Sequence, residues 1–155
     1  MPSGFEPVWE FQHSVDCSAS RQFVWNYWTD ISNWNDPPAT FHLDGPFRVG
    51  ARLTTNLPGQ TLQSVVRDID VEREATIEMQ LTDATFLFHW MFEKLAENET
   101  RIHQRLVLAG GSAKSLVAQA SILERTAPEG MKRLVAAIER AQVLNNGILI
   151  IKLRA

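Results

Sequence analysis

Turn-forming residues recur about every ten residues between Ala39 and Gly111, and this spacing constrains the fold more than any other feature of the sequence. The turn signals are Gly45-Pro46, Gly50, Pro58-Gly59, Glu72-Arg73-Glu74, Thr82-Asp83, Glu97-Asn98-Glu99 and Gly110-Gly111. These turn signals separate about six predicted strands, and no helical pattern lies between the strands that could form a parallel crossover. We therefore predict consecutive antiparallel hairpins that form a single sheet.

Two of these hairpins can be tested for register, because a shift of one residue would move every side chain to the other face. A three-residue loop at 97–99 pairs Phe92 with Gln104, Trp90 with Leu106 and Phe88 with Leu108, and places Glu93 opposite His103. The same construction around 72–74 pairs Val71 with Ala75, Ile69 with Ile77, Arg67 with Met79 and Val65 with Leu81. Each hairpin then has one nearly apolar face, which should line the core. His89, Met91 and His103 fall on the opposite, convex face.

Helical patterns precede and follow the predicted hairpins in the sequence. Residues 8–15 alternate as a strand, and Ser18 or Ser20 can then cap a short helix over about 19–29. Asp30 and Ser32 can cap a second short turn that presents Trp34 before Pro37-Pro38 ends it. A helical piece over about 112–123 and a second helix beginning near Pro128 follow the sheet. The apolar stripe of this last helix should cover the concave face of the sheet, and its residues are Met131, Leu134, Val135, Ile138 and Ala141.

The last residues, 143–155, form an apolar tail. Asn145-Asn146-Gly147 resembles a helix stop or turn, and ILIIKL then reads as a strand. An uncovered strand of this kind would aggregate, so we expect it to pack on its own sheet edge or on a second subunit. A homodimer is therefore one of two arrangements that remain open.

Several segments of the sequence resemble one known superfamily. They read FVWNYWTDISNWND, LDGPFRVGARL, FLFHWMF followed by ETRIHQRLVLAG, and APEGMKRLVAAIERA. Together with the predicted order of elements, they resemble the START-related (SRPBCC) superfamily, and within it the polyketide cyclase/dehydrase-like branch, over about Val8 to Gln142. The resemblance implies an α+β helix-grip fold, in which a curved antiparallel sheet of about seven strands wraps around a long C-terminal helix. It also implies a hydrophobic ligand cavity between sheet and helix.

Composition excludes several other classes of protein. A chain of 155 residues fits one domain, and its net charge of -3 with scattered Lys and Arg gives no footprint for nucleic acid. The longest apolar run is too short to span a membrane, and the N-terminus has no pattern of a secretion signal, so we expect a cytoplasmic location. No phosphate loop, HExxH, CxxC or GxSxG motif is present, and His13, His89 and His103, which lie on predicted strands, have no Asp, Glu or Cys two residues away. We therefore expect no metal and no cofactor, and an inert, buried Cys17.

The predicted ligand-binding residues follow from the register and the covering helix. They are Trp28, Phe41, Arg67, Met79, Phe88, Trp90, Gln104, Met131 and Val135. An inward Arg67 would need a ligand carboxylate, phosphate or carbonyl, since an unpaired buried guanidinium is costly. The alternative is a bulge near Asp68 that turns Arg67 to solvent and Val66 inward. Gln104 would contact the ligand or satisfy backbone groups and waters in the cavity.

Three classes of function fit this pattern. The first is binding or transport of a small hydrophobic molecule, such as a lipid-like, polyketide or aromatic compound, because the lining is apolar and no catalytic cluster is visible. The second is an enzyme of the polyketide cyclase or dehydratase type, with an inward polar group polarising a carbonyl. The third is a protein-interaction module that uses the convex face or the tail.

Overall fold

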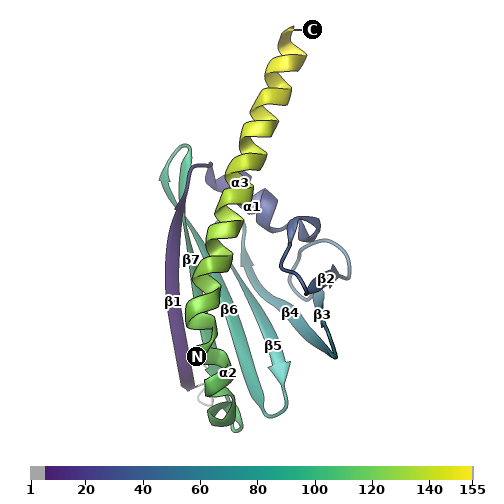
Figure 1. Cartoon of the computed structure of the whole chain (residues 1–155), viewed down its shortest axis with the longest axis vertical. Helices are drawn as coiled ribbons and strands as arrows, with labels where there is room; N and C mark the ends of the chain where they lie inside the picture. Colours follow the sequence, from purple (N-terminus) through teal and green to yellow (C-terminus); the bar gives the residue numbers. More distant parts are fainter. Residues whose placement is uncertain (1–5, 155) are drawn as a thin grey trace.

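The computed structural model describes the backbone of residues 6–154 and the side chains of residues 6–146. Seven antiparallel strands form one curved sheet in the order β1-β7-β6-β5-β4-β3-β2. The strands are β1 (Pro7–Cys17), β2 (Thr40–Leu43), β3 (Arg52–Leu57), β4 (Gln60–Asp70), β5 (Glu74–Leu81), β6 (Ala84–Ala96) and β7 (Glu99–Ala109). The long helix α3 (Leu123–Arg154) lies along one face of the sheet, as Figure 1 shows. The predicted seven-stranded helix-grip architecture is confirmed.

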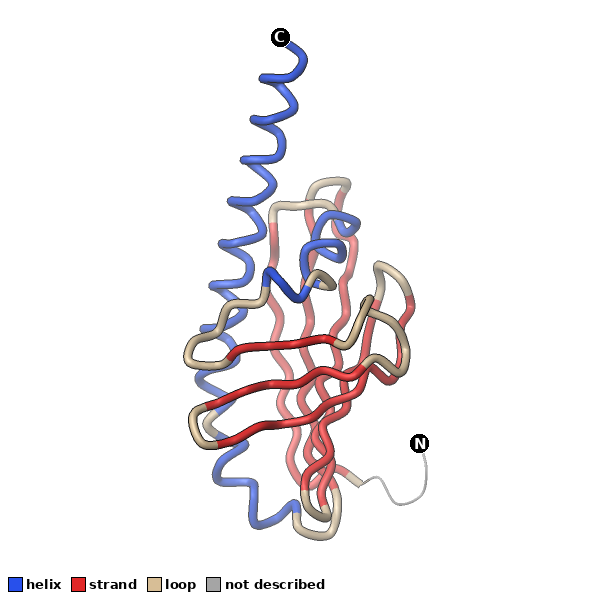
Figure 2. The backbone as a smooth tube through the Cα atoms, turned by 90° about the vertical axis from the view of Figure 1, so that its right-hand side faces the viewer, coloured by secondary structure: helices blue, strands red, loops and turns tan. Residues whose placement is uncertain are grey.

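The two short helices after β1 form where the sequence pattern predicts them. Helix α1 (Arg21–Trp28) begins after Ser20, whose hydroxyl accepts a hydrogen bond from the Phe23 amide at 3.1 Å. The short helix η1 (Ile31–Asn33) follows, and the Asp30 carboxylate caps it by accepting a bond from the Ser32 amide at 3.1 Å. Both caps satisfy amides that have no partner within a helix. Together these turns carry the chain from β1 across the sheet to β2 (Figure 2).

The β6–β7 hairpin keeps the predicted faces but not the predicted partners. Trp90 pairs with Gln104 and Phe88 with Leu106, two residues away from the register expected from a three-residue loop. The reason is a tighter turn, with Ala96 opposite Glu99 and an irregularity between Lys94 and Ala96. A shift of two residues leaves every side chain on its face, because the period of a strand is two.

The β4–β5 hairpin contains a β-bulge next to Arg67, which is the alternative to an inward-facing Arg67. Ile69 pairs with Ala75 and Val66 with Ile77, so the register shifts between Val66 and Asp68 and Arg67 has no partner. Val66 points inward and is 0% exposed, whereas Arg67 lies on the convex face. The inward placement of Arg67 is therefore wrong: the bulge avoids burying an unpaired guanidinium and buries an isopropyl group instead.

The covering helix is longer than predicted at both ends. After η2 (Ala113–Leu116) and α2 (Val117–Ser121), helix α3 begins at Leu123, so Pro128 lies inside it and is not its first residue. The helix continues through Asn145-Asn146-Gly147 to Arg154 and extends well past the sheet (Figure 1). The prediction of a strand over 148–153 is wrong, because a helix satisfies its backbone groups internally where no sheet edge is close by. Val143 and Leu144 on this extension are 70% and 62% exposed.

Two clusters of apolar side chains lie between the sheet and the helices. The larger surrounds Trp28 and is formed by α1, the inner faces of β5–β7 and the α3 residues Met131, Val135 and Ile138. The smaller surrounds Trp9 and Phe86 at the end of the sheet near α2. Among the described residues, no helix is both long and apolar enough to cross a membrane.

Candidate functional site

A cavity of about 740 Å³ lies between α3, strands β6 and β7, and the segment that follows α1. Its lining residues are Tyr27, Trp28, Asn33, Trp34, Asn35, Asp36, Pro37, Phe41, Phe88, Trp90, Gln104, Leu106, Leu123, Thr126, Ala127, Gly130, Met131, Arg133, Leu134, Ala136, Ala137 and Arg140. Pockets for small ligands usually measure about 300–1,000 Å³ and are mostly apolar with a few placed polar groups. The volume and the lining both match such a pocket.

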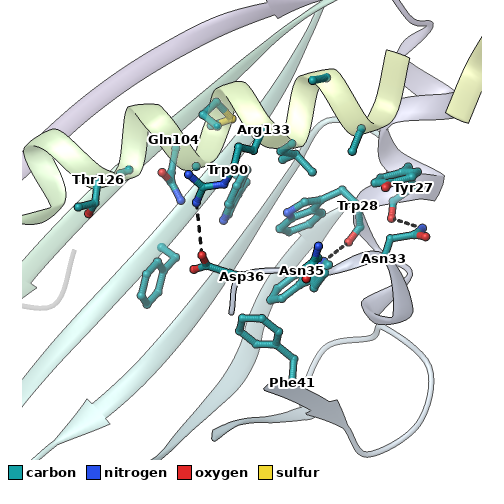
Figure 3. Close-up of a pocket in the computed structure, with 18 of the residues that line it drawn as sticks. Tyr27, Trp28, Asn33, Asn35, Asp36, Phe41, Trp90, Gln104, Thr126 and Arg133 are labelled. Carbon is teal, nitrogen blue, oxygen red and sulfur yellow. Dashed lines mark hydrogen bonds and ion pairs between the residues drawn. The ribbon is translucent and has the colours of Figure 1, made fainter. Parts of the chain in front are cut away.

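Aromatic rings form one wall of the cavity. The ring of Trp28 lies 5.0 Å from that of Trp90 and 6.0 Å from that of Trp34, between ring centroids. Phe41 meets Trp34 edge to face at 5.3 Å. The indole nitrogen of Trp34 donates a hydrogen bond to the Trp28 carbonyl at 2.7 Å, which fixes the ring against the end of α1. Figure 3 labels Trp28, Trp90 and Phe41 of this wall, and the ring contacts make it a preformed aromatic surface.

The opposite wall is the inner side of α3, and small residues leave the space open there. Ala127, Gly130 and Ala137 lie on the cavity side, with Met131 and Leu134 between them. A longer side chain at any of the three small positions would enter the cavity. The cavity therefore exists because the helix carries short side chains opposite the aromatic wall.

One polar side chain lies on the sheet at the bottom of the cavity. Gln104 on β7 is 9% exposed, and its Oε1 lies 2.6 Å from Nε2 of His13 on β1. The two residues are direct partners in the β1–β7 ladder, so both point to the concave face. Because Oε1 carries no hydrogen, His13 donates this bond and the Gln104 amide nitrogen remains for the cavity.

Charged side chains gather at the mouth. The Arg133 guanidinium on α3 lies 3.3 Å from the Asp36 carboxylate in the loop before β2, and both side chains are more than 60% exposed. Arg140, two turns further along α3, also lines the opening. The mouth thus carries two cations and one anion, while the chain as a whole has a net charge of -3.

The convex face of the sheet carries a different set of charges. Arg101 bonds the Asp16 carboxylate at 2.7 Å, and Arg105 bonds that of Glu10. These hydrogen bonds lower the pKa of Asp16 and Glu10. Pairs of this kind at the surface contribute little to stability. His89 and His103 lie on this face as predicted, away from the cavity.

Six of the nine predicted ligand-binding residues line the cavity: Trp28, Phe41, Phe88, Trp90, Gln104 and Met131. The other three do not. Arg67 is on the convex side of the bulge, 3.7 Å from Glu78. Met79 packs against the smaller cluster, and Val135 is 7% exposed within the larger one. A role in ligand binding stays a prediction for the six.

The sequence-based prediction missed most of the mouth and the helix wall. Asn35, Asp36 and Pro37 belong to an irregular loop, which no periodic pattern can place. The sequence pattern predicts Trp34 on a short turn, but no periodic signal shows that this turn faces the cavity. The small residues of α3 could have been found, because Ala127, Gly130, Ala137 and Leu134 recur at helical spacing.

The fold can be compared with proteins of known structure. No protein-family model and no curated protein matches the sequence. A point mutant of norcoclaurine synthase from Thalictrum flavum, in complex with a transition state analogue, superposes with a TM-score of 0.68. It is 14% identical over 88% of this chain and 98% of that chain. The chain shares its helix-grip fold with this protein.

Two further helix-grip structures agree with this assignment. The Zhui aromatase/cyclase from Streptomyces sp. R1128 is 17% identical, with a TM-score of 0.66 over 85% of this chain and 94% of its own. A protein from Arthrobacter aurescens is 19% identical, with a TM-score of 0.65 over 84% of this chain and 86% of its own. At such identities the likeness establishes the fold, and function has to be argued from the cavity.

Proposed function

We propose that the protein binds a small, hydrophobic and largely aromatic molecule in the cavity between α3 and the sheet. The observation that carries this proposal is the aromatic wall of Trp28, Trp34, Phe41 and Trp90, which faces about 740 Å³ of space. A planar apolar molecule bound there removes apolar surface of both the ligand and the protein from water, which favours binding. Contacts between aromatic rings make the binding free energy more favourable still. Norcoclaurine synthase, a helix-grip protein, has been solved with dopamine and hydroxybenzaldehyde.

The proposal is tested with 8-anilinonaphthalene-1-sulfonate (ANS), whose emission rises when it enters an apolar site. We expect saturable binding with one site per chain, and energy transfer from the Trp side chains that line the cavity. The decisive variant is Ala137→Phe, which adds a ring on the cavity side of α3. It should weaken binding at least tenfold by occupying the space that the probe needs.

The matched control is Ala118→Phe, which adds the same ring at an exposed position of α2 outside the cavity. It should bind ANS like the wild type. Equal affinity in the Ala137→Phe variant, with an unchanged melting temperature, would place the probe elsewhere and reject the proposed site. Native mass spectrometry of the protein as purified is a second measurement, since a carried apolar ligand would appear as a fixed mass increment.

An enzyme of the cyclase or dehydratase type is the second candidate, and the Gln104 amide favours it. A donor fixed in an enclosed site can stabilise negative charge that develops on a carbonyl oxygen during enolisation. The test is to incubate the protein with a synthetic aromatic β-hydroxyketone, which loses its α proton and its β-hydroxyl as water, and to follow this loss of water by mass spectrometry. Gln104→Met should abolish any acceleration, and a rate equal to the buffer rate with wild-type protein would reject catalysis of this reaction.

A further inference from the structure

Gln104 is the buried polar side chain among the residues that line the cavity. It is 9% exposed and belongs to β7, which lies between β1 and β6, and Trp90 on β6 is its neighbour. Its amide has two ends with opposite hydrogen-bonding character, since the oxygen accepts and the nitrogen donates. Which end faces the cavity therefore decides what kind of ligand atom can bind there.

His13 determines this orientation. Its Nε2 lies 2.6 Å from the Gln104 oxygen, and the ring stacks on Phe11 at 5.4 Å with an interplanar angle of 22°. The stacking and the β1–β7 register hold the imidazole in place beside the amide. With an N–H of His13 directed at the oxygen, the amide nitrogen is turned to the cavity.

Two further donors lie on the same side of the cavity as Gln104. The indole N–H groups of Trp28 and Trp90 make no hydrogen bond to the described residues. The Asn33 amide nitrogen donates to the Tyr27 carbonyl at 3.0 Å and the Thr126 hydroxyl donates to the Ile122 carbonyl at 3.3 Å, so these two groups offer only their oxygens, as acceptors. Trp90 pairs with Gln104 on the sheet and Trp28 lies against Trp90 (Figure 3), so the groups beside the Gln104 amide are donors.

We infer that the ligand carries a hydrogen-bond acceptor of the carbonyl type on its buried end, and that His13 selects for it by orienting the Gln104 amide. This inference rests on the proposed function and adds the chemical class of the ligand: an aromatic or polycyclic ketone, quinone or related carbonyl compound. Gln104 contacts the ligand oxygen. His13 acts through Gln104 and is a positioning residue.

The experiment compares two rigid probes of nearly equal shape, 9-fluorenone, which has a carbonyl, and fluorene, which has none. Their dissociation constants are measured by displacement of ANS, and the quantity of interest is the ratio of the fluorene value to the fluorenone value. Differences in hydration of the probes cancel when this ratio is compared between protein variants. We expect the ratio to be about three- to tenfold higher in the wild type than in Gln104→Met, as befits one hydrogen bond.

Two further variants test the orientation. Gln104→Glu keeps the shape but places an oxygen on the cavity side, so it should lower the preference for fluorenone at least as much as Gln104→Met does. His13→Phe keeps the stacking ring and removes the N–H, so the amide can rotate and the ratio should fall. A Gln at position 13 can again donate to the Gln104 oxygen, so His13→Gln should restore part of the ratio. A purely structural role of His13 would weaken both probes equally and leave the ratio unchanged.

The outcomes separate this inference from the proposed function. Binding of both probes with the same ratio in wild type, Gln104→Met and His13→Phe overturns the carbonyl inference and leaves aromatic binding in place. Failure of the wild type to bind either probe rejects both. A ratio that falls in Gln104→Met but not in His13→Phe assigns the contact to Gln104 and removes His13 from the selection.

Discussion

Cys17 should be almost unreactive in the folded protein, and its reactivity can be worked out from its surroundings. The side chain ends β1, is 0% exposed and belongs to the cluster around Trp28. Burial raises the pKa of the thiol to about 12, and the negative charge of Glu139 acts in the same direction. At pH 8 about one thiol in ten thousand is then ionised, against about one in ten at the ordinary pKa of 9.0. Ionisation alone slows the reaction about a thousandfold, before steric exclusion is counted.

The assay is release of the coloured thiolate from Ellman's reagent at pH 8, in buffer and in 6 M guanidinium chloride. Because Cys17 is the only cysteine, the signal reports one site, and Cys17→Ala gives the blank. We expect the folded rate to be at least a thousandfold below the unfolded rate. A folded rate within tenfold of the unfolded rate would refute the burial of Cys17 and the packing of α3 over this end of the sheet.

The same pKa shift makes stability depend on pH in a defined direction. Above pH 9 the unfolded chain loses the thiol proton, while the folded chain keeps it until about pH 12. The contribution of this group is therefore complete below pH 9 and is lost as pH rises through that interval. The free energy of unfolding should fall more steeply between pH 9 and 11 for the wild type than for Cys17→Ala. Parallel curves would contradict the shift.

Three substitutions distinguish the core, the mouth and the convex face. Trp28→Ala should reduce the free energy of unfolding by about 3–5 kcal/mol in urea denaturation, because its side chain is 1% exposed and contacts several rings; a loss below 1 kcal/mol would contradict this packing. Arg67→Ala should leave ANS affinity unchanged, since the bulge keeps the guanidinium outside the cavity; weaker binding would return Arg67 to the site. Asp36→Asn should release Arg133 and strengthen binding of anionic ANS without changing that of neutral fluorene; equal effects on both probes would indicate a change of shape, not of charge.

Most of the elements, and the faces of β6 and β7, follow from the sequence alone. Alternation with a period of two placed Phe88, Trp90 and Gln104 on the concave face, and this held even though the partners across the β6–β7 hairpin differ by two residues. The Ser20 cap and the α3 stripe through Met131 and Ile138 are local or periodic signals of the same kind. Such signals depend on neighbours within a few residues, so they survive an error in the exact length of a turn.

Contacts between distant segments are what the tertiary structure decided. Whether Arg67 faced inward depended on a bulge, and the sequence allowed both arrangements. The His13–Gln104 bond joins residues 91 positions apart, and the Arg133–Asp36 pair joins residues 97 positions apart. Met79 and Val135 lie on the predicted inner faces of their elements, but neighbouring side chains enclose them in the core, so they do not line the cavity. The periodicity of a segment determines on which side of a strand or helix each residue lies. Whether that residue is enclosed in the core or lines the cavity depends on how α3 and the loop before β2 pack over the sheet.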